Sequence, residues 1–422
     1  MVKRGLILGS TAALMTGLAF AGFQVAGLAA FRNSPKELVD EVWQIINRDY
    51  VDGTFNKVDW QATRRKYLNR DYASKADAYR AVREMLQTLD DPYTRFLDPE
   101  QFKSMQIDTS GELSGVGLTL GIDEETKKLT VVSPIEDSPA AEAGILAKDE
   151  ITSINGRSTK GMDINEAVSL IRGPQGTKVK LGVQRGTRQF EVEIKRAKIE
   201  LHAVKAAVRE TDIGKVGYIR LTQFNANAAG DMRKAIKSHN EANVQGFVLD
   251  LRSNPGGLLY SSAEIAKMFV ENATIVSTVD RKGESERLTA NRQALTDKPL
   301  VVLVDGGSAS ASEILSGALQ DNKRAVIVGT KTFGKGLVQS VHSLSDGSGL
   351  AVTIAKYLTP NGTDINKSGI KPDVVVELPQ KQKEDLAKNQ DKIGTNADQQ
   401  FVKALEVLKQ QVKAQAKSST GA

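Results

Sequence analysis

From residue 215 onward, apolar strand-like segments alternate with helical patterns, and this alternation constrains the fold more than any other feature of the chain. Strands that alternate with helices pack as a largely parallel sheet that the helices cover. The sequence therefore predicts an α/β core. The alternating segments are, in chain order, residues 215–221, 231–239, 246–251, 261–270, 300–304, 312–320, 325–328 and 337–341.

Residues 1–31 carry the pattern of an export segment. Lys3 and Arg4 precede an uncharged run, residues 5–31, that is long enough to span a bilayer. Ala19-Phe-Ala21 offers a cleavage site for a signal peptide, whereas the apolar stretch that continues to Phe31 favours an uncleaved membrane anchor. The sequence leaves these two open. Both predict export to the periplasm or another extracytoplasmic space, with attachment to the inner membrane if the segment is retained.

Two further regions are predicted to be helical and carry no evident chemistry. Residues 34–107 show apolar side chains at helical spacing and read as a packing region. Residues 381–422 are rich in lysine and glutamine, and Phe401, Leu405 and Leu408 form a helical stripe. This pattern predicts a solvated C-terminal helix with a frayed end. The helical ends are where a homo-oligomer would form.

Composition excludes several classes of site. The chain has no cysteine, which rules out disulfides, thiolate metal sites and cysteine nucleophiles. Its 57 basic and 51 acidic residues give a formal charge of +6, a mild excess over 422 residues. Because no basic block is interleaved with aromatic residues, the sequence does not predict a nucleic-acid partner.

Residues 110–198 change to short strands and glycine turns. Ser138, Pro139 and Gly144 bound one short helix as cap, first helical residue and terminator. Asn155-Gly156 is typical of a two-residue hairpin turn. This order of elements resembles a PDZ domain. The resemblance places the carboxylate-binding loop at Gly115, Val116, Gly117 and Leu118, and backbone amides in such a turn suit a terminal carboxylate.

Small residues follow the apolar strand 300–304 in the sequence Asp305-Gly-Gly-Ser-Ala-Ser-Ala-Ser312. They allow a serine to sit on a sharp strand-to-helix turn, where helix N-terminal amides face an incoming carbonyl. Spacing alone does not choose among Ser308, Ser310 and Ser312, and all three are also ordinary turn and cap residues.

Lys335 is flanked by Gly334 and Gly336 and lies in a segment without acidic residues from Lys331 to Ser345. A lysine can act as the base for a serine only if its pKa falls toward neutrality, and burial lowers it. Gln339 follows four residues later, and a strand through both would place them on one face, where the amide could orient the amine.

Asp250-Leu-Arg-Ser-Asn-Pro-Gly-Gly257 ends another predicted strand in a tight glycine turn, whose amides could complete an oxyanion hole. Asp250 and Arg252 read as a structural ion pair. The three histidines, His202, His239 and His342, show no metal-ligand spacing, and His239 reads as helix surface. A histidine-based serine hydrolase would have to use one of them.

Together these motifs resemble the C-terminal processing, or tail-specific, peptidases, which are PDZ-containing Ser/Lys proteases. The resemblance implies Ser310 as nucleophile, Lys335 as general base and Gln339 as its orienting partner. It also implies oxyanion donors at the amides of Ala311 and Gly256. Arg172 resembles an arginine of the PDZ domain that couples peptide binding to the active site in some members.

The sequence thus predicts a multidomain α/β protein in which a PDZ domain is inserted beside a protease core. The predicted parts are 1–31 (signal or anchor), 34–107 (helical), 110–198 (PDZ), 199–380 (protease core) and 381–422 (helical tail). The predicted function is an exported serine endopeptidase that uses a Ser/Lys dyad to cleave proteins near their C-terminus. Its PDZ domain would bind the free apolar C-terminus of the substrate, and no metal or cofactor is needed. The alternative is a catalytically silent PDZ scaffold that binds peptides.

Overall fold

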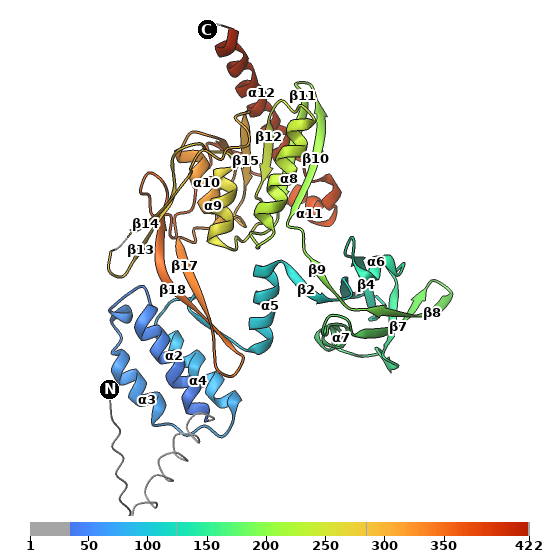
Figure 1. The fold of residues 1–422 in the computed structure, drawn as a ribbon, viewed down its shortest axis with the longest axis vertical. Helices are drawn as coiled ribbons and strands as arrows, with labels where there is room; N and C mark the ends of the chain where they lie inside the picture. Colours follow the sequence, from blue (N-terminus) through green and yellow to red (C-terminus); the bar gives the residue numbers. More distant parts are fainter. Residues whose placement is uncertain (1–33, 124, 284, 421–422) are drawn as a thin grey trace, which may run out of the picture. The chain divides into compact units, whose positions relative to one another are not determined.

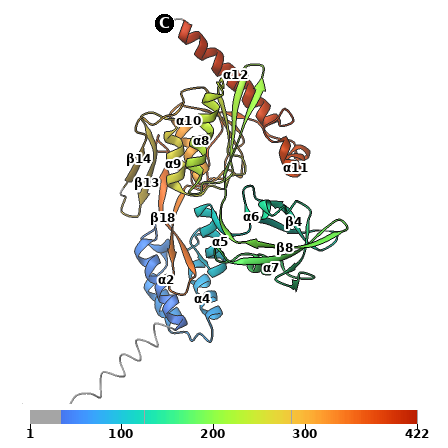
Figure 2. The same cartoon turned by 45° about the vertical axis from the view of Figure 1, so that its right-hand side comes forward.

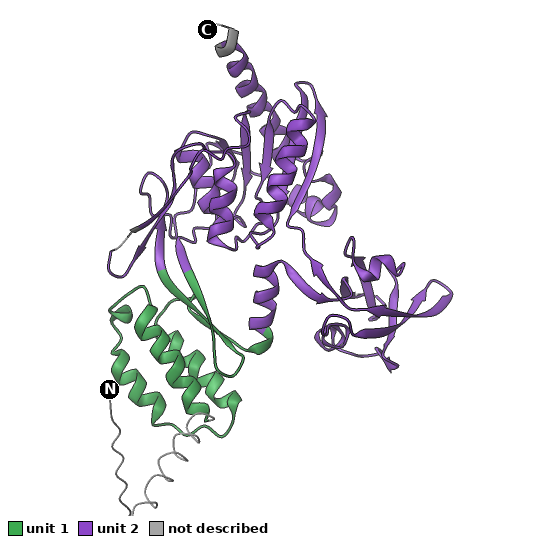
Figure 3. Ribbon diagram, in the orientation of Figure 1, with its two compact units in different colours: residues 1–100, 339–354 green, residues 101–338, 355–422 purple. Residues whose placement is uncertain are grey.

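The computed structural model describes residues 34–123, 125–283 and 285–420. The chain divides into two compact units (Figure 3). Unit 1 contains the residues up to Glu100 together with Gln339–Ile354, and unit 2 contains Gln101–Val338 and Ala355–Ala422. The predicted signal peptide or anchor, residues 1–31, lies outside the described residues. Across the described ranges, no helix has the length and apolar character that a membrane span requires.

The part of unit 1 that the structure describes is helical, as the sequence predicts for this region. It contains α2 (Pro35–Asp49), α3 (Trp60–Leu68) and α4 (Lys75–Gln87), with a short 3₁₀ turn η1 (Phe55–Lys57). The side chain of Asp59 accepts a hydrogen bond from Ala62 N at the start of α3, and Ser74 caps α4 in the same way. The apolar positions at helical spacing, such as Ile46 and Met85, are fully buried between the helices.

A β-hairpin completes unit 1. It is formed by β17 (Leu337–Ser343) and β18 (Gly349–Leu358), and β18 also pairs with the short strand β1 (Arg95–Leu97). Hydrogen bonds attach the hairpin to the helices, including Ser345 Oγ to Glu41 and Tyr79 Oη to Asp346, each 2.7 Å. Strand β1 was not predicted, because three residues are too few to show alternation.

The predicted PDZ region forms its own sheet in the order β3-β4-β5-β7-β8. Asn155 and Gly156 both have positive φ, 50° and 81°, as the predicted hairpin turn requires. Ser138 caps helix α6 as predicted. The elements are β3 (Leu118–Ile122), β4 (Leu129–Pro134), α6 (Pro139–Glu142), β5 (Glu150–Ile154), β6 (Arg157–Ser158), α7 (Ile164–Ile171), β7 (Lys178–Arg185) and β8 (Arg188–Lys195). Helix α5 (Pro99–Ser110) and strand β2 (Glu112–Gly115) precede this sheet in the chain, and β9 (Ala197–Glu200) follows it. Strands β2 and β9 pair with each other.

A six-stranded sheet outside the PDZ region has the order β10-β11-β12-β15-β16-β19. Every neighbouring pair from β11 to β19 is parallel, and the edge strand β10 is antiparallel to β11, so the predicted largely parallel sheet is confirmed. Its strands are β10 (Val204–Thr211), β11 (Gly214–Leu221), β12 (Phe247–Asp250), β15 (Leu300–Val304), β16 (Val326–Gly329) and β19 (Val374–Val375).

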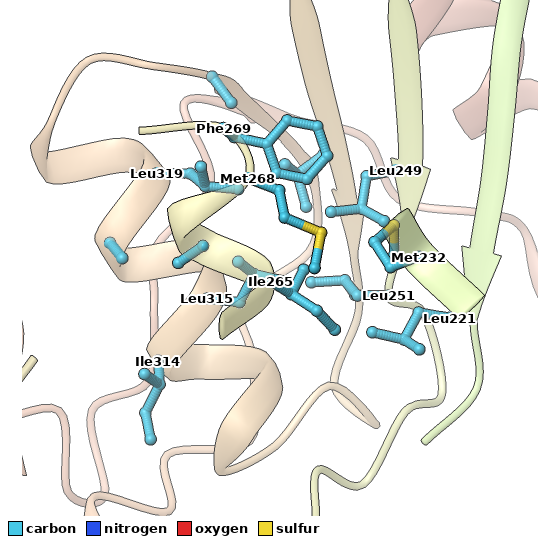
Figure 4. Packing of buried hydrophobic residues seen from close by; sticks show 14 of the residues in the cluster. Leu221, Met232, Leu249, Leu251, Ile265, Met268, Phe269, Ile314, Leu315 and Leu319 are labelled. Atoms are coloured by element: carbon cyan, nitrogen blue, oxygen red, sulfur yellow. The ribbon is translucent and has the colours of Figure 1, made fainter. Parts of the chain in front are cut away.

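Helices α8 (Ala228–Glu241), α9 (Leu259–Lys267) and α10 (Ala311–Asp321) cover one face of this sheet (Figures 1 and 2). Figure 4 shows Met232, Leu249, Ile265 and Leu315 from these helices and strands packed into one apolar layer. Beside α10 runs an antiparallel pair, β13 (Thr274–Asp280) and β14 (Ser285–Thr289), which the sequence analysis missed.

The predicted C-terminal helix is present, but the prediction that it is solvated was wrong. The tail contains α11 (Gln380–Lys388), η2 (Gln390–Lys392) and α12 (Gln399–Thr420). Phe401, Ala404 and Leu408 of α12 are at most 2% exposed and pack on the sheet face opposite α8–α10. A largely parallel sheet needs both faces covered, and α12 supplies the second cover.

Candidate active site

Ser310 lies on the turn between β15 and α10, where it is the N-cap residue of α10. Its backbone has φ 53° and ψ −113°, a region that non-glycine residues rarely adopt. Such strain persists only where the surroundings hold it, and it is typical of serine nucleophiles on strand-to-helix turns. The side chain is half-buried. The predicted sharp turn is therefore present.

The structure distinguishes the three candidate serines that spacing could not. Ser308 and Ser312 are fully buried. Ser308 Oγ donates to Leu251 O (2.8 Å), and Ser312 Oγ donates to Asn254 O (2.9 Å). Both hydroxyls therefore tie the turn to the segment that follows β12, and only Ser310 combines partial exposure with the strained backbone.

The buried carboxylate of Glu313 connects the turn to the lysine segment. Its Oε2 accepts hydrogen bonds from the backbone nitrogens of Ser310 (2.8 Å) and Lys335 (2.9 Å). Its Oε1 accepts from Thr332 Oγ1 (2.5 Å) and Gly334 N (2.7 Å). The backbone nitrogens of Ser310 and Lys335 thus lie within 3 Å of one oxygen atom, so the fold brings the two predicted catalytic residues together.

Lys335 lies in an irregular segment, residues 331–336, that precedes β17. The glycines around it permit close approach of another segment. A Cβ at Gly334 would lie 3.0 Å from Lys367 C, and one at Gly336 would lie 2.7 Å from Asn366 N. The Gly-Lys-Gly pattern thus reflects packing as well as chemistry. The Lys335 side chain is half-buried.

The argument that Lys335 and Gln339 share one face of a strand was wrong, because β17 begins only at Leu337. Gln339 is the first residue of the hairpin portion that clusters with unit 1, whereas Ser310 and Lys335 belong to unit 2. Its Nε2 atom is buried without a hydrogen-bond partner among the described residues. The role of Gln339 stays a prediction.

Tyr357 on β18 also supports both segments. Its hydroxyl donates to the carbonyl oxygen of Ser310 (3.1 Å), and its backbone N–H donates to Gly336 O (3.1 Å). The side chain is fully buried. Sequence reasoning missed both Glu313 and Tyr357. The spacing Ser-x-x-Glu of a capping box could have indicated Glu313, whereas nothing in the sequence singles out Tyr357.

The two predicted oxyanion donors lie close together. A Cβ built on Gly256 would stand 2.9 Å from the Ala311 nitrogen. The Ala311 N–H is the first of α10, so it has no carbonyl partner within the helix. The Gly256 N–H, however, donates to Asn254 Oδ1 (2.9 Å). Donation from Gly256 to an oxyanion therefore requires that this bond be shared or exchanged.

Asp250 and Arg252 form the structural ion pair that the sequence predicts, with Arg252 Nη2 2.6 Å from Asp250 Oδ2. Burial works to raise the pKa of the Asp250 carboxyl, but Arg252 and the hydroxyl of Tyr218 outweigh it and hold this pKa below its ordinary value. The charges are therefore retained inside the core.

In the PDZ sheet, Val116 and Gly117 form the loop between β2 and β3, and Val116 is 1% exposed. Gly117 has φ 82°, and a Cβ there would lie 2.2 Å from Ser138 Cβ. Arg172 is the C-cap residue of α7 and lies against Gly115, whose added Cβ would be 3.9 Å from Arg172 Cγ. The predicted carboxylate loop and Arg172 are thus neighbours, although their binding roles stay predictions.

The prediction that His239 lies on a helix surface was wrong. It is 4% exposed and packs beside Phe247, and burial lowers its pKa although its contact with Tyr218 O opposes this. His342 lies in unit 1, 3.5 Å from Asp49, and His202 contacts Asp231 at 2.9 Å. Over the residues that the structure describes, no group of histidine and carboxylate side chains is arranged to hold a metal ion.

Residues 215–376 match the model of peptidase family S41, residues 130–185 match a PDZ domain, and residues 31–87 match the tricorn protease C1 domain. A carboxyl-terminal-processing protease of Synechocystis sp. is 47% identical over 369 residues, which cover 87% of this chain and 86% of that protein. This chain belongs to peptidase family S41. The predicted family, its PDZ domain and its α/β fold class are confirmed.

Other S41 peptidases extend the comparison. The carboxy-terminal processing protease CtpA of Bacillus subtilis is 40% identical, covering 74% of this chain and 67% of that protein. Among solved structures, the photosystem II D1 C-terminal processing protease matches with a TM-score of 0.56 and 36% identity, covering 86% of this chain and 98% of that chain. Peptidases of this family are of the serine type, and a peptidase with a PDZ domain acts on proteins or peptides.

Proposed function

We propose that this S41 peptidase is an exported endopeptidase that cleaves proteins near their C-terminus with a Ser310/Lys335 dyad. The observation that carries the proposal is the shared Glu313 oxygen, which fixes the backbones of both residues beside the start of α10. The names of the 47% and 40% identical relatives support cleavage near the C-terminus.

In the proposed reaction, neutral Lys335 accepts the proton of the Ser310 hydroxyl as Oγ attacks the scissile carbonyl carbon. The carbonyl oxygen becomes an oxyanion, which the amide of Ala311 and, after exchange of its present bond, that of Gly256 stabilise. Collapse of the tetrahedral intermediate transfers the proton to the leaving amine and leaves an acyl-enzyme. Water then attacks the ester with Lys335 as base and regenerates Ser310.

The PDZ domain would select the substrate. The amides of the Val116–Gly117 loop would bind the terminal carboxylate, and the edge of β3 would pair with the tail as an added strand. In support, β3 is the edge strand of its sheet and α7 lies beside it. Arg172, next to Gly115, would link tail binding to the active site. An apolar tail is the expected ligand.

Export is proposed from the sequence of residues 1–31, with its basic start and uncharged run. The enzyme would act in the periplasm or another extracytoplasmic space, either released or held at the inner membrane. Fractionation of cells that express the full chain, with determination of the mature N-terminus, distinguishes release from retention and would detect a cytoplasmic protein.

The test of the activity uses an unstructured protein with an apolar C-terminal tail, followed by intact mass. Wild type, Ser310→Ala and Lys335→Ala are compared, each with free and amidated tails. We expect cleavage by the wild type alone, slowed by amidation. Mutants that cut as well as wild type would contradict the dyad. An inert wild type that still binds the tail would favour a silent PDZ scaffold.

A further inference from the structure

The C-terminal segment beyond the part that matches the S41 model reaches the base of the proposed oxyanion loop. That match ends at residue 376, whereas Asp398 and Gln400 lie beyond it. Asp398 is fully buried and contacts Arg252, which immediately precedes the loop residues 253–257. The segment therefore contributes buried polar contacts next to the active site.

Arg252 is held by three side chains at once. Its Nε and Nη2 donate to the two oxygens of Asp250, at 2.9 and 2.6 Å. Its Nη1 and Nη2 donate to the two oxygens of Asp398, at 3.0 and 2.6 Å, and Nη1 also donates to Gln400 Oε1 at 3.0 Å. All five guanidinium hydrogens can be used in this way. Three of these five bonds come from the C-terminal segment.

Asp398 is itself fixed. Its Oδ2 accepts from Gly394 N (3.1 Å) and its Oδ1 from Phe401 N (3.2 Å), so the turn before α12 and the first turn of α12 hold the carboxylate in place. Gln400 is anchored in turn, because its Nε2 donates to Val376 O (2.8 Å). Asp398 and Gln400 together form a clamp on Arg252. Because both are themselves anchored, this clamp is rigid, unlike a flexible ion pair at the surface.

The loop that begins after Arg252 is connected to the nucleophile turn. Ser253, with φ 56°, donates its N–H to Asp305 Oδ1 (2.8 Å). Asn254 O accepts from Ala309 N (3.0 Å), and Asn254 Oδ1 accepts from Gly256 N (2.9 Å). A shift at Arg252 would therefore be passed to Gly256 and to the turn that carries Ser310.

Space exists for such a shift. A cavity of about 430 Å³ adjoins Arg252 and Ser253 and is bounded by Gln400 and by Leu386 of α11. Without Asp398, Arg252 would keep its two bonds to Asp250, but other N–H groups of its buried guanidinium would lose their acceptors. Movement of the side chain toward this cavity would give those groups access to water, and the cost of leaving them unpaired would favour it. Loss of the clamp is thus expected to displace the loop rather than leave it in place.

We propose that Asp398 is a positioning residue for the peptidase reaction, acting through Arg252 to fix the loop that carries the Gly256 donor. This rests on the proposed function, in which the Gly256 amide stabilises the oxyanion. The C-terminal segment then supports the active site. It would stabilise the transition state of the reaction and leave the affinity for the substrate unchanged.

The test compares wild type, Asp398→Asn and the matched control Asp385→Asn, which breaks a contact with Lys392 in the same segment. The full chain is used, and kcat is expressed per active site titrated with a fluorophosphonate. We expect Asp398→Asn to lower kcat about 10- to 100-fold with KM within twofold, since a complete oxyanion donor is worth about 10²–10³. Asp385→Asn should match wild type.

A peptide aldehyde supplies the readout that a merely structural role would not move, because its tetrahedral adduct places an oxyanion in the hole. Its affinity should fall by the same factor as kcat. A folded Asp398→Asn enzyme with unchanged kcat and aldehyde affinity would overturn the proposal. If that variant is unfolded at the assay temperature, Gln400→Met is measured instead, because it removes another bond from the C-terminal segment to Arg252. An unchanged kcat would contradict the proposal that this segment positions Arg252, and a loss of kcat with unchanged KM would support it.

The proposed function is tested separately by the loss of cleavage in Ser310→Ala. If that variant still cuts, the dyad fails. If it does not cut while Asp398→Asn behaves as wild type, only the positioning role fails.

Discussion

Glu313 and Lys335 are joined by a 2.9 Å hydrogen bond from the lysine backbone N–H to the buried carboxylate, across 22 residues of sequence. The bond does not involve the lysine amine, so it fixes the position of the residue without engaging its side chain. The same oxygen accepts from Ser310 N. Glu313 therefore sets the spacing between the proposed nucleophile and its base.

Glu313→Gln should impair catalysis more than folding. An amide replaces one accepting oxygen with a donor, which then faces backbone N–H groups, so two hydrogen bonds are lost. We expect kcat to fall about 100-fold, the effect of a displacement near 1 Å at a reacting group. Stability should fall by about 2–4 kcal/mol because buried donors lose their acceptor. Active-site-titrated kinetics and thermal unfolding measure the two effects.

Glu264→Gln is the control for that substitution. Glu264 pairs with Lys267 on the surface of α9 and is 43% exposed at its side chain. Exposed ion pairs contribute about 0–1 kcal/mol, so both stability and kcat should stay close to wild type. A Glu313→Gln enzyme that keeps full activity would show that the carboxylate only supports the fold.

Tyr357→Phe removes the hydroxyl that donates to Ser310 O and leaves the ring packed. A neutral hydrogen bond contributes about 0.5–1.5 kcal/mol, so we expect a loss of about that size in stability. If the bond holds the strained turn during attack, kcat should fall by up to about tenfold. Tyr79→Phe deletes a hydroxyl bonded to Asp346 in unit 1 and should lower stability alone. Equal kcat in the two variants would exclude a role for Tyr357 at Ser310.

Much of the fold could be predicted from local pattern. The strands β11, β12 and β15 are apolar runs, and Ser138, Pro139 and Gly144 mark a helix by their backbone chemistry. Segments whose structure depends on partners could not be predicted. The three residues of β1 form a strand only because β18 pairs with them. Helix α12 is buried on one side only because it packs on an apolar face of the sheet.

The candidate site shows the same division. Ser310 and Lys335 stand out because their neighbours are small residues and glycines. Their contact through Glu313 could not be seen, because burial of a glutamate depends on four donors that converge from two segments. The error at Gln339 has a similar cause, since Lys335 lies two residues before β17 begins and where a strand begins depends on its partner.

Acid should weaken the protease core through His239. Burial holds the pKa of this imidazole below its ordinary value, so the unfolded chain takes up the proton more readily than the folded chain. Above the unfolded pKa of about 6.5 the imidazole is neutral in both states, and its titration does not change the free energy of unfolding. As the pH falls below that value, the unfolded chain is protonated first and the free energy of unfolding decreases. Urea unfolding at pH 7.5 and 5.5 should show a smaller loss in His239→Gln than in wild type. Identical losses would contradict this assignment.

Gly117→Ala should separate tail binding from the chemistry at Ser310. The residue has φ 82°, which costs an alanine about 1–2 kcal/mol, and the new Cβ would lie 2.2 Å from Ser138 Cβ. The Val116–Gly117 loop must then move, so affinity for a peptide with an apolar free C-terminus should fall at least about tenfold. Binding is measured by fluorescence anisotropy in the Ser310→Ala background. Gly161→Ala, with φ 71° and open space around its Cβ, carries the same strain without the clash and should bind normally. If Gly117→Ala binds as tightly as Gly161→Ala, the carboxylate is bound elsewhere than at this loop.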